Sequence, residues 1–136
     1  MSPANIVLIE DNPADVFLVE LALKENGIAY HLTRFASGDE AVRVLCETGV
    51  ADAAVPDVIL LDLNTPRSDG FQVLIRLKQT PALAHVPLAI LTSSHATSDK
   101  HRARLQGTRH IEKQSQLNDF LTTVGQAVKE MLAQAS

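Results

Sequence analysis

The sequence has one cysteine, no apolar run longer than four residues and no excess of basic side chains. Cys46 has no cysteine partner for a disulfide and no ligand at metal-binding spacing, so we expect a buried apolar side chain. A membrane span needs about 20 apolar residues, and the N-terminus lacks the features of a signal peptide. The net charge of -4 argues against binding to nucleic acid. We therefore expect a cytoplasmic protein with no membrane or nucleic-acid partner.

The 136 residues have an ordinary globular composition, with 46% apolar and 21% charged side chains. Chains of roughly 100 to 200 residues usually form one domain. No internal repeat and no linker interrupts the sequence. We expect a single domain over residues 1–136.

Short apolar segments alternate with longer helical segments. Five segments are too short for helices and are predicted as strands: 6–9, 28–32, 58–61, 88–91 and 109–111. Three of them are apolar at every position, which is typical of parallel strands covered on both faces. The alternation predicts an α/β fold, a doubly wound five-stranded parallel sheet with helices on both faces.

Helix boundaries carry signals of their own. Starts are indicated at Asp11 or Asn12 with Pro13, at Ser37 with Glu40 and at Asp69-Gly70; ends are indicated at Asn26-Gly27 and Thr80-Pro81. The last helix has an apolar stripe from Leu117 to Leu132. The stretch from Thr92 to His110 has few apolar anchors, so we expect it to be loosely held.

Acidic side chains follow two of the predicted strands. Glu10 and Asp11 come after the first strand, and Asp62 comes after the third, with Asn64 two residues on. Ligands of doubly wound folds lie beyond the carboxyl ends of the strands. Carboxylates gathered there repel one another and need a nearby cation. Oxygen ligands of this kind indicate Mg²⁺ rather than zinc or copper.

A hydroxyl and an ammonium group follow the other two strands at this edge. Thr92 follows the fourth strand and Lys113 the fifth. A carboxylate nucleophile, Mg²⁺, a hydroxyl and a lysine together are what phosphoryl transfer requires, because charged oxygens must be neutralised while an in-line oxygen attacks. The set predicts phosphoryl chemistry.

These motifs resemble the receiver domain of two-component response regulators. The resemblance covers essentially the whole chain, and it is carried by Glu10-Asp11, the run 62–70, Leu91-Thr92-Ser93 and Lys113. Each motif is weak by itself, whereas four in the right order at the ends of the right strands are specific.

The resemblance implies a role for each matched residue. Asp62 would be the phosphoacceptor and Thr92 and Lys113 would bind phosphoryl oxygens. Mg²⁺ would be held by Glu10, Asp11, Asp62 and the backbone carbonyl of Asn64. His110, three residues before Lys113, stands where the family has its switch aromatic.

The resemblance implies a signalling switch that takes phosphate from a sensor histidine kinase and carries no output domain. It would not be an enzyme, apart from phosphorylating itself and slowly losing the phosphate. Segments 11–15 and 77–92 are more similar to stand-alone regulators of phytochrome-type histidine kinases. Phe17, with Val16 and Leu21, gives the first helix an outward apolar side for kinase docking.

Phosphorylation would change the face made by the segment before the fifth strand, that strand and the last helix. With no output domain, we expect this face to form a homodimer. Its basic residues from Lys100 to Arg109 could then pair with Asp119 and Glu130 of a second copy.

Other functions fit less well. A pseudo-receiver that binds or scaffolds without phosphorylation stays open as the alternative, although the intact set of site residues argues against it. A flavin binder would need a phosphate loop rich in Ser, Thr and Gly after the first strand, which is absent. An aspartyl-nucleophile hydrolase would need its nucleophile there with a second Asp two residues on, which Glu10-Asp11-Asn12 does not supply. Gln114 departs from the family, which usually has proline after the lysine, so we expect a differently shaped loop at that point.

Overall fold

The apolar segments predicted as strands form one parallel sheet. The computed structural model describes residues 3–47, 55–63, 70–92, 108–113 and 116–135. Its strands are β1 (Ala4–Ile9), β2 (Tyr30–Phe35), β3 (Val58–Asp62), β4 (Leu88–Thr92) and β5 (Arg109–Glu112). They pair in parallel in the order β2-β1-β3-β4-β5. This is the flavodoxin-like order of a doubly wound sheet, and it confirms the predicted fold.

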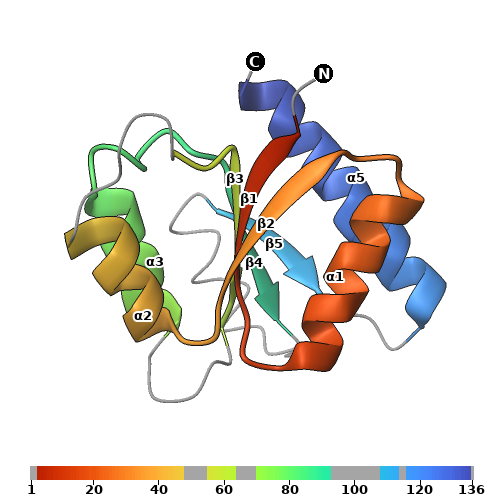
Figure 1. The fold of residues 1–136 in the computed structure, drawn as a ribbon, viewed down its shortest axis with the longest axis horizontal. Helices are drawn as coiled ribbons and strands as arrows, with labels where there is room; N and C mark the ends of the chain where they lie inside the picture. The colour runs from red at the N-terminus through yellow and green to blue at the C-terminus, as the bar shows by residue number, and fades with distance from the viewer. Residues whose placement is uncertain (1–2, 48–54, 64–69, 93–107, 114–115, 136) are drawn as a thin grey trace.

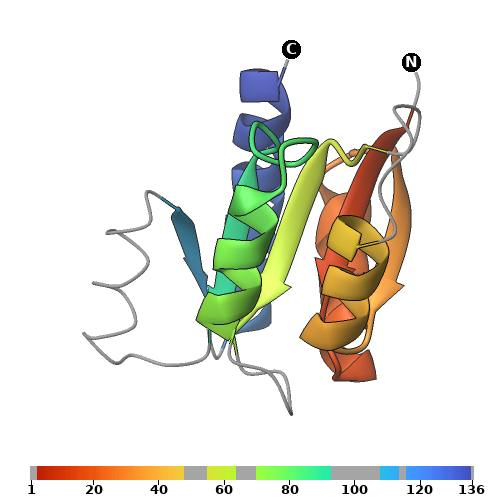
Figure 2. The same cartoon turned by 90° about the vertical axis from the view of Figure 1, so that its left-hand side faces the viewer.

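Helices cover both faces of the sheet (Figures 1 and 2). α1 (Pro13–Glu25) and α5 (Leu117–Ala135) lie on one face, and α2 (Gly38–Val42), the π-helical turn η1 (Arg43–Glu47) and α3 (Gly70–Gln79) lie on the other. Because both faces are covered, β3 is buried at every position and a separate core forms on each side. No described helix is long and apolar enough to cross a membrane. The segment predicted to be loosely held lies almost wholly outside the described residues.

The second strand begins two residues later than predicted and runs further. The sequence pattern predicts a strand over 28–32, whereas β2 is Tyr30–Phe35. Ile28 instead belongs to the end of α1, because its N–H donates to the carbonyl of Leu23 at 3.0 Å. Gly27 precedes it with a φ of 69°, a left-handed conformation that glycine adopts without strain. The apolar Ile28 therefore marks a helix end rather than a strand start.

The helix starts follow the predicted signals. Asn12 caps α1, with its Oδ1 accepting from the N–H of Ala14 at 2.9 Å, and Pro13 is the first helical residue. Ser37 caps α2 by accepting from the N–H of Glu40 at 3.2 Å. These caps satisfy N–H groups that have no partner inside the helix, which fixes where each helix begins.

The far end of α1 is anchored to α5. Asn26 donates through Nδ2 to the carbonyls of Ala22 at 2.7 Å and Leu121 at 3.2 Å. Gly125 makes room for this side chain, since a Cβ atom at Gly125 would collide with Asn26. With one end capped and the other tied to α5, α1 presents its first turn to the edge of the sheet in a fixed position.

Two apolar side chains are more exposed than the patterns predict. Leu117 is 49% exposed, because as the first residue of α5 it precedes the turn on which Phe120 enters the core. Cys46 is half-buried rather than buried, and its Sγ donates a weak hydrogen bond to the carbonyl of Arg76 at 3.8 Å.

Candidate functional site

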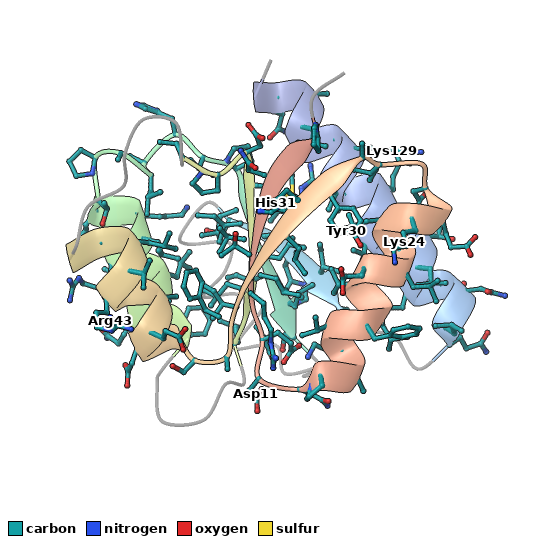
Figure 3. The ribbon with its side chains drawn as sticks, viewed as in Figure 1. Asp11, Lys24, Tyr30, His31, Arg43 and Lys129 are labelled. Atoms are coloured by element: carbon teal, nitrogen blue, oxygen red, sulfur yellow. The ribbon has the colours of Figure 1, made fainter. Side chains whose placement is uncertain are left out.

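The polar residues that end or follow the strands meet at one edge of the sheet. Parallel strands bring their carboxyl ends to the same edge, where Figure 3 places Asp11. Glu10, Asp62 and Thr92 are buried there, and they are the buried polar side chains of the described residues. Thr92 is the last residue of β4, one strand away from Asp62. Carboxylates this deeply buried need charged or hydrogen-bonding partners.

The carboxylates predicted as metal ligands lie together. Glu10, Asp11 and Asp62 each offer an oxygen atom, and these oxygens lie within 4.8 Å of one another. Asp11 is half-buried, so the group can be reached from solvent. Hard oxygen ligands close together, with solvent on one side, suit a divalent cation that keeps part of its water shell. The residues present therefore fit the predicted kind of metal site.

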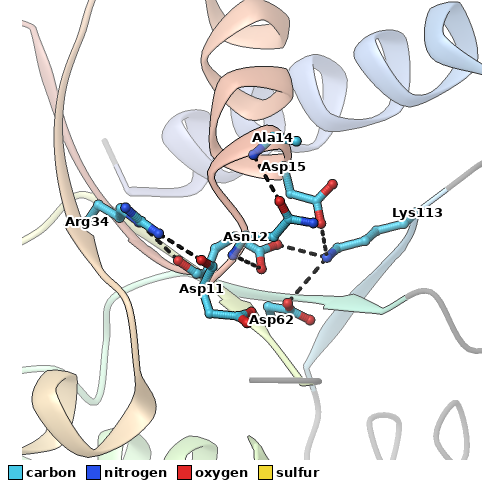
Figure 4. Close-up of polar contacts among 8 residues, drawn as sticks. Asp11, Asn12, Ala14, Asp15, Arg34, Asp62 and Lys113 are labelled. Carbon is cyan, nitrogen blue, oxygen red and sulfur yellow. Dashed lines mark hydrogen bonds and ion pairs between the residues drawn. The ribbon is translucent and has the colours of Figure 1, made fainter. Parts of the chain in front are cut away.

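Lys113 places a positive charge among these carboxylates (Figure 4). Its Nζ donates to Oε1 of Glu10 at 2.8 Å, to Oδ2 of Asp15 at 2.9 Å and to Oδ2 of Asp62 at 3.2 Å. Burial lowers the pKa of Lys113, but its hydrogen bonds and the surrounding negative charges outweigh burial and hold that pKa above its ordinary value. The ammonium group therefore stays charged throughout the physiological pH range.

The pKa of Glu10 is also raised, which favours the uncharged form of this carboxyl group. The pKa of Glu10 is raised to about 8: burial is the largest cause, the hydrogen bond to Asp62 and the charge of Asp62 also raise it, and Lys113 lowers it. The contact with Lys113 thus does not offset burial and the neighbouring carboxylate. A divalent cation would favour the ionised form of Glu10, so cation binding is coupled to loss of a proton.

Most of the chain matches a known protein family. Residues 6–125 match the response regulator receiver domain. The chain belongs to this family. The matched residues include the acidic cluster, Thr92 and Lys113. Members of the family take a phosphoryl group from histidine kinases, and they are signalling switches that are generally not enzymes in the ordinary sense.

Several solved structures similar to this receiver are named as phytochrome or bacteriophytochrome response regulators. Response regulator Rcp1 of Synechocystis sp. is 40% identical over 98 residues, which are 71% of this chain and 67% of Rcp1. The structure of phosphorylated RcpA, a cyanobacterial phytochrome response regulator, aligns with a TM-score of 0.85 at 30% identity over 99% of this chain and 98% of RcpA. The Mn²⁺-bound form of Rcp1 aligns with a TM-score of 0.81 at 32% identity over 96% of this chain and 95% of that one.

Two residues contact the site that the sequence patterns did not identify. Asp15 binds the Lys113 ammonium, and Arg34 of β2 donates to the backbone carbonyls of Glu10 at 3.0 Å and Asp11 at 2.9 Å. Asp15 lies four residues after Asp11, and side chains at this spacing share one face of a helix. Because α1 begins at Pro13, Asp11 lies before the helix and the spacing gives no signal. Arg34 lies near the carboxyl end of β2, but only the register of β2 against β1 brings it to this loop.

His110 lies on the same face of the sheet as Thr92. It pairs in register with Ile90, and Glu112 pairs with Thr92. Because side chains two residues apart on a strand share a face, His110 and Thr92 lie on the same side of the sheet, toward the core that contains Ile90. His110 is half-buried there, in the strand next to Thr92. This position suits a ring that responds to movement of Thr92.

Besides the segment expected to be loosely held, which contains most of the basic residues of the expected dimer face, two predicted features fall outside the described residues. Asn64, whose carbonyl is predicted to bind the cation, is one of them, and Gln114 is the other. The roles of both stay predictions.

Without a divalent cation, the receiver is expected to lose stability as the pH rises from about 5 to about 8.5. The pKa of Glu10 is about 8 in the folded protein and 4.5 for an unperturbed glutamate, so between these values the folded state holds a proton that the unfolded state lacks. Its stabilising contribution is full below the lower value and is lost as the pH passes the upper one. Urea unfolding in EDTA at several pH values measures this decline.

Glu10→Gln is the control, because it keeps the shape of the side chain and cannot ionise. We expect its free energy of unfolding to change less with pH than that of the wild type, and saturating Mg²⁺ to reduce the decline in the wild type. Identical pH profiles for wild type and Glu10→Gln would contradict this assignment.

Proposed function

We propose that this receiver takes a phosphoryl group from a histidine kinase onto Asp62 in a Mg²⁺-dependent reaction and thereby acts as a signalling switch. The observation that carries the proposal is the placement of Asp62. Its carboxylate lies 2% exposed at the end of β3, 3.2 Å from the Lys113 ammonium and grouped with Glu10 and Asp11. Beside this carboxylate, Lys113 can bind the negative charge of a phosphoryl group, and Glu10 and Asp11 can help to bind a cation.

The residues have distinct tasks in the transfer. An oxygen of Asp62 forms the bond to phosphorus while the bond from phosphorus to the kinase histidine breaks, and the histidine nitrogen keeps the electron pair. Lys113 binds a phosphoryl oxygen, and the hydroxyl of Thr92 donates to another. A bound Mg²⁺, held by Glu10, Asp11, Asp62 and the predicted carbonyl of Asn64, would supply positive charge against the repulsion between phosphoryl group and nucleophile.

The pseudo-receiver alternative has less support. A domain that only binds or scaffolds has no need to bury carboxylates beside a lysine at an energetic cost, whereas a phosphoacceptor needs them. The described part of the chain keeps the acidic cluster, Thr92 and Lys113 in one place. We therefore favour phosphorylation.

Asp62→Asn is expected to abolish phosphorylation, because the amide keeps the shape of the side chain and removes the nucleophile. Incubation with acetyl phosphate and Mg²⁺, followed by mass spectrometry of the intact protein and its peptides, measures the phosphate and locates it. Wild-type protein in EDTA is the matched control and should stay unmodified. Phosphate appearing on Asp62→Asn at the wild-type rate, or in EDTA, would rule out the assignment.

The kinase would dock at the start of α1 and α5. Phe17 is 63% exposed and Leu117 is 49% exposed, and each lies near the start of one of the two helices that share a sheet face. Both helices begin at the edge of the sheet that holds Asp62. Val16, predicted to point outward, packs against the core instead, because the helix turns that side chain toward the sheet. The docking surface therefore depends on Phe17 more than on its neighbour.

Phe17→Ala is expected to slow phosphoryl transfer from the cognate kinase by at least about fivefold, since exposed aromatic side chains often dominate an interface. Stability should change little, because a buried Phe→Ala would cost about 3 to 5 kcal/mol and an exposed one far less. Phosphorylation by acetyl phosphate, which needs no docking, is the control and should stay at the wild-type rate. Equal transfer from the kinase in both proteins would remove Phe17 from the docking surface.

The kinase itself is proposed to be of the phytochrome type. RcpA supports this, since its solved structure is named as that of a cyanobacterial phytochrome response regulator.

One ion pair expected between the two copies of the predicted homodimer forms within a single chain instead. Arg109 already pairs with Glu130 of the same chain, with Nη1 2.7 Å from Oε2. A dimer would have to exchange that ion pair or rely on other contacts.

His110 is proposed to carry the phosphorylation signal to α5. Beryllofluoride is a phosphoryl mimic. In His110→Ala, we expect its binding to shift the amide signals of residues near Asp62 only. Amide NMR spectra with and without beryllofluoride measure this: in the wild type, signals of β5 and α5 should shift as well. His85→Ala, at an exposed position before β4, is the control. The same pattern of shifts in His110→Ala and wild type would exclude this residue as the switch.

A further inference from the structure

Lys113 has a carboxylate partner outside the acidic cluster. Asp15 lies in the first turn of α1, its Oδ2 is 2.9 Å from the Lys113 Nζ, and its side chain is 26% exposed. Within the described residues, the group of carboxylates that could hold a cation contains Glu10, Asp11 and Asp62 but not Asp15. Asp15 is therefore placed to bind the lysine and is not part of that cation-binding group.

A cation in the cluster competes with Lys113 for the same carboxylate groups. Glu10 and Asp62 both accept hydrogen bonds from Nζ, and both belong to the cluster. A divalent cation there draws on their lone pairs and also repels the ammonium group, because like charges interact strongly where solvent is scarce. Cation binding thus weakens two of the three carboxylate contacts that hold Lys113. The contact to Asp15 is the one it does not weaken in this way.

The position of Asp15 is set by its helix. The cap at Asn12 and the proline at Pro13 fix the first turn of α1, and Asp15 stands within that turn. A carboxylate at a helix N-terminus is also favoured by the helix dipole. Its place therefore does not depend on the ligands of the cluster.

We propose that Asp15 is a positioning residue that keeps the Lys113 ammonium at the phosphoryl-binding position while a divalent cation occupies Glu10, Asp11 and Asp62. This inference rests on the proposed function, because it assigns Lys113 to the phosphoryl group. Two simpler roles for Asp15 would act without Lys113: offsetting the helix dipole, and raising cation affinity by its charge alone. If Asp15 acts through Lys113, replacing Asp15 has no effect once Lys113 has been replaced. The two simpler roles predict that the effect persists.

Beryllofluoride binding to the Mg²⁺-saturated protein tests the proposal, with the dissociation constant measured by calorimetry. We expect Asp15→Asn to weaken binding about five- to tenfold, the range of a partly buried ion pair. In a Lys113→Met background the same substitution should have no further effect. Asp15→Glu should recover most of the affinity. Glu25→Gln, which removes an exposed acid from the other end of α1, should match the wild type.

The proposal is overturned if Asp15→Asn weakens binding equally with and without Lys113, or does not weaken it at all. A second measurement needs no substitution at Lys113, in case that variant does not fold. The Nζ protons of Lys113 in the Mg²⁺-bound protein should exchange slowly with solvent in the wild type and faster in Asp15→Asn, and equal exchange rates would overturn the proposal. Failure of the proposed function differs from either result, because the wild type itself would then bind no beryllofluoride.

Discussion

The structure depends on one ammonium group held among carboxylates at the edge of a buried sheet. Lys113 comes from the end of the last strand, and its three partners come from the loop after β1, from α1 and from the end of β3. Segments about a hundred residues apart in sequence are thereby joined at one point. Each carboxylate alone would be costly to bury, and together they repel one another. The lysine makes the arrangement possible without fully neutralising it.

The negative charge of the acidic cluster is the basis of the proposed phosphorylation. Burial, the hydrogen bond with Asp62 and the charge of Asp62 raise the pKa of Glu10 to about 8, although Lys113 opposes them. A divalent cation is the natural complement, and the Mn²⁺-bound structure of Rcp1 shows that a relative binds one. With cation and lysine both present, the carboxylate of Asp62 can meet a negatively charged phosphoryl group. In the proposed function, the carboxylates that are costly to bury are the same groups that bind the cation and accept the phosphoryl group.

Sequence patterns predicted the parallel sheet, its helix caps and the residues that end or follow its strands, because apolar runs and capping side chains act locally. They misplaced the start of β2, since the apolar Ile28 looks the same whether it ends a helix or begins a strand. They also missed Arg34 and Asp15. Neither belongs to a local pattern, and each reaches the site only through tertiary structure: the pairing of β2 with β1, and the packing of α1 against the edge where Lys113 emerges.

A crystal structure of the receiver grown with Mg²⁺ and beryllofluoride tests the central claim most directly. The account predicts beryllium bonded to an oxygen of Asp62, the cation bound by Glu10, Asp11 and Asp62, and the Lys113 ammonium contacting a fluorine atom. Beryllofluoride on another carboxylate, a cation outside the acidic cluster, or Lys113 turned away to solvent would contradict it.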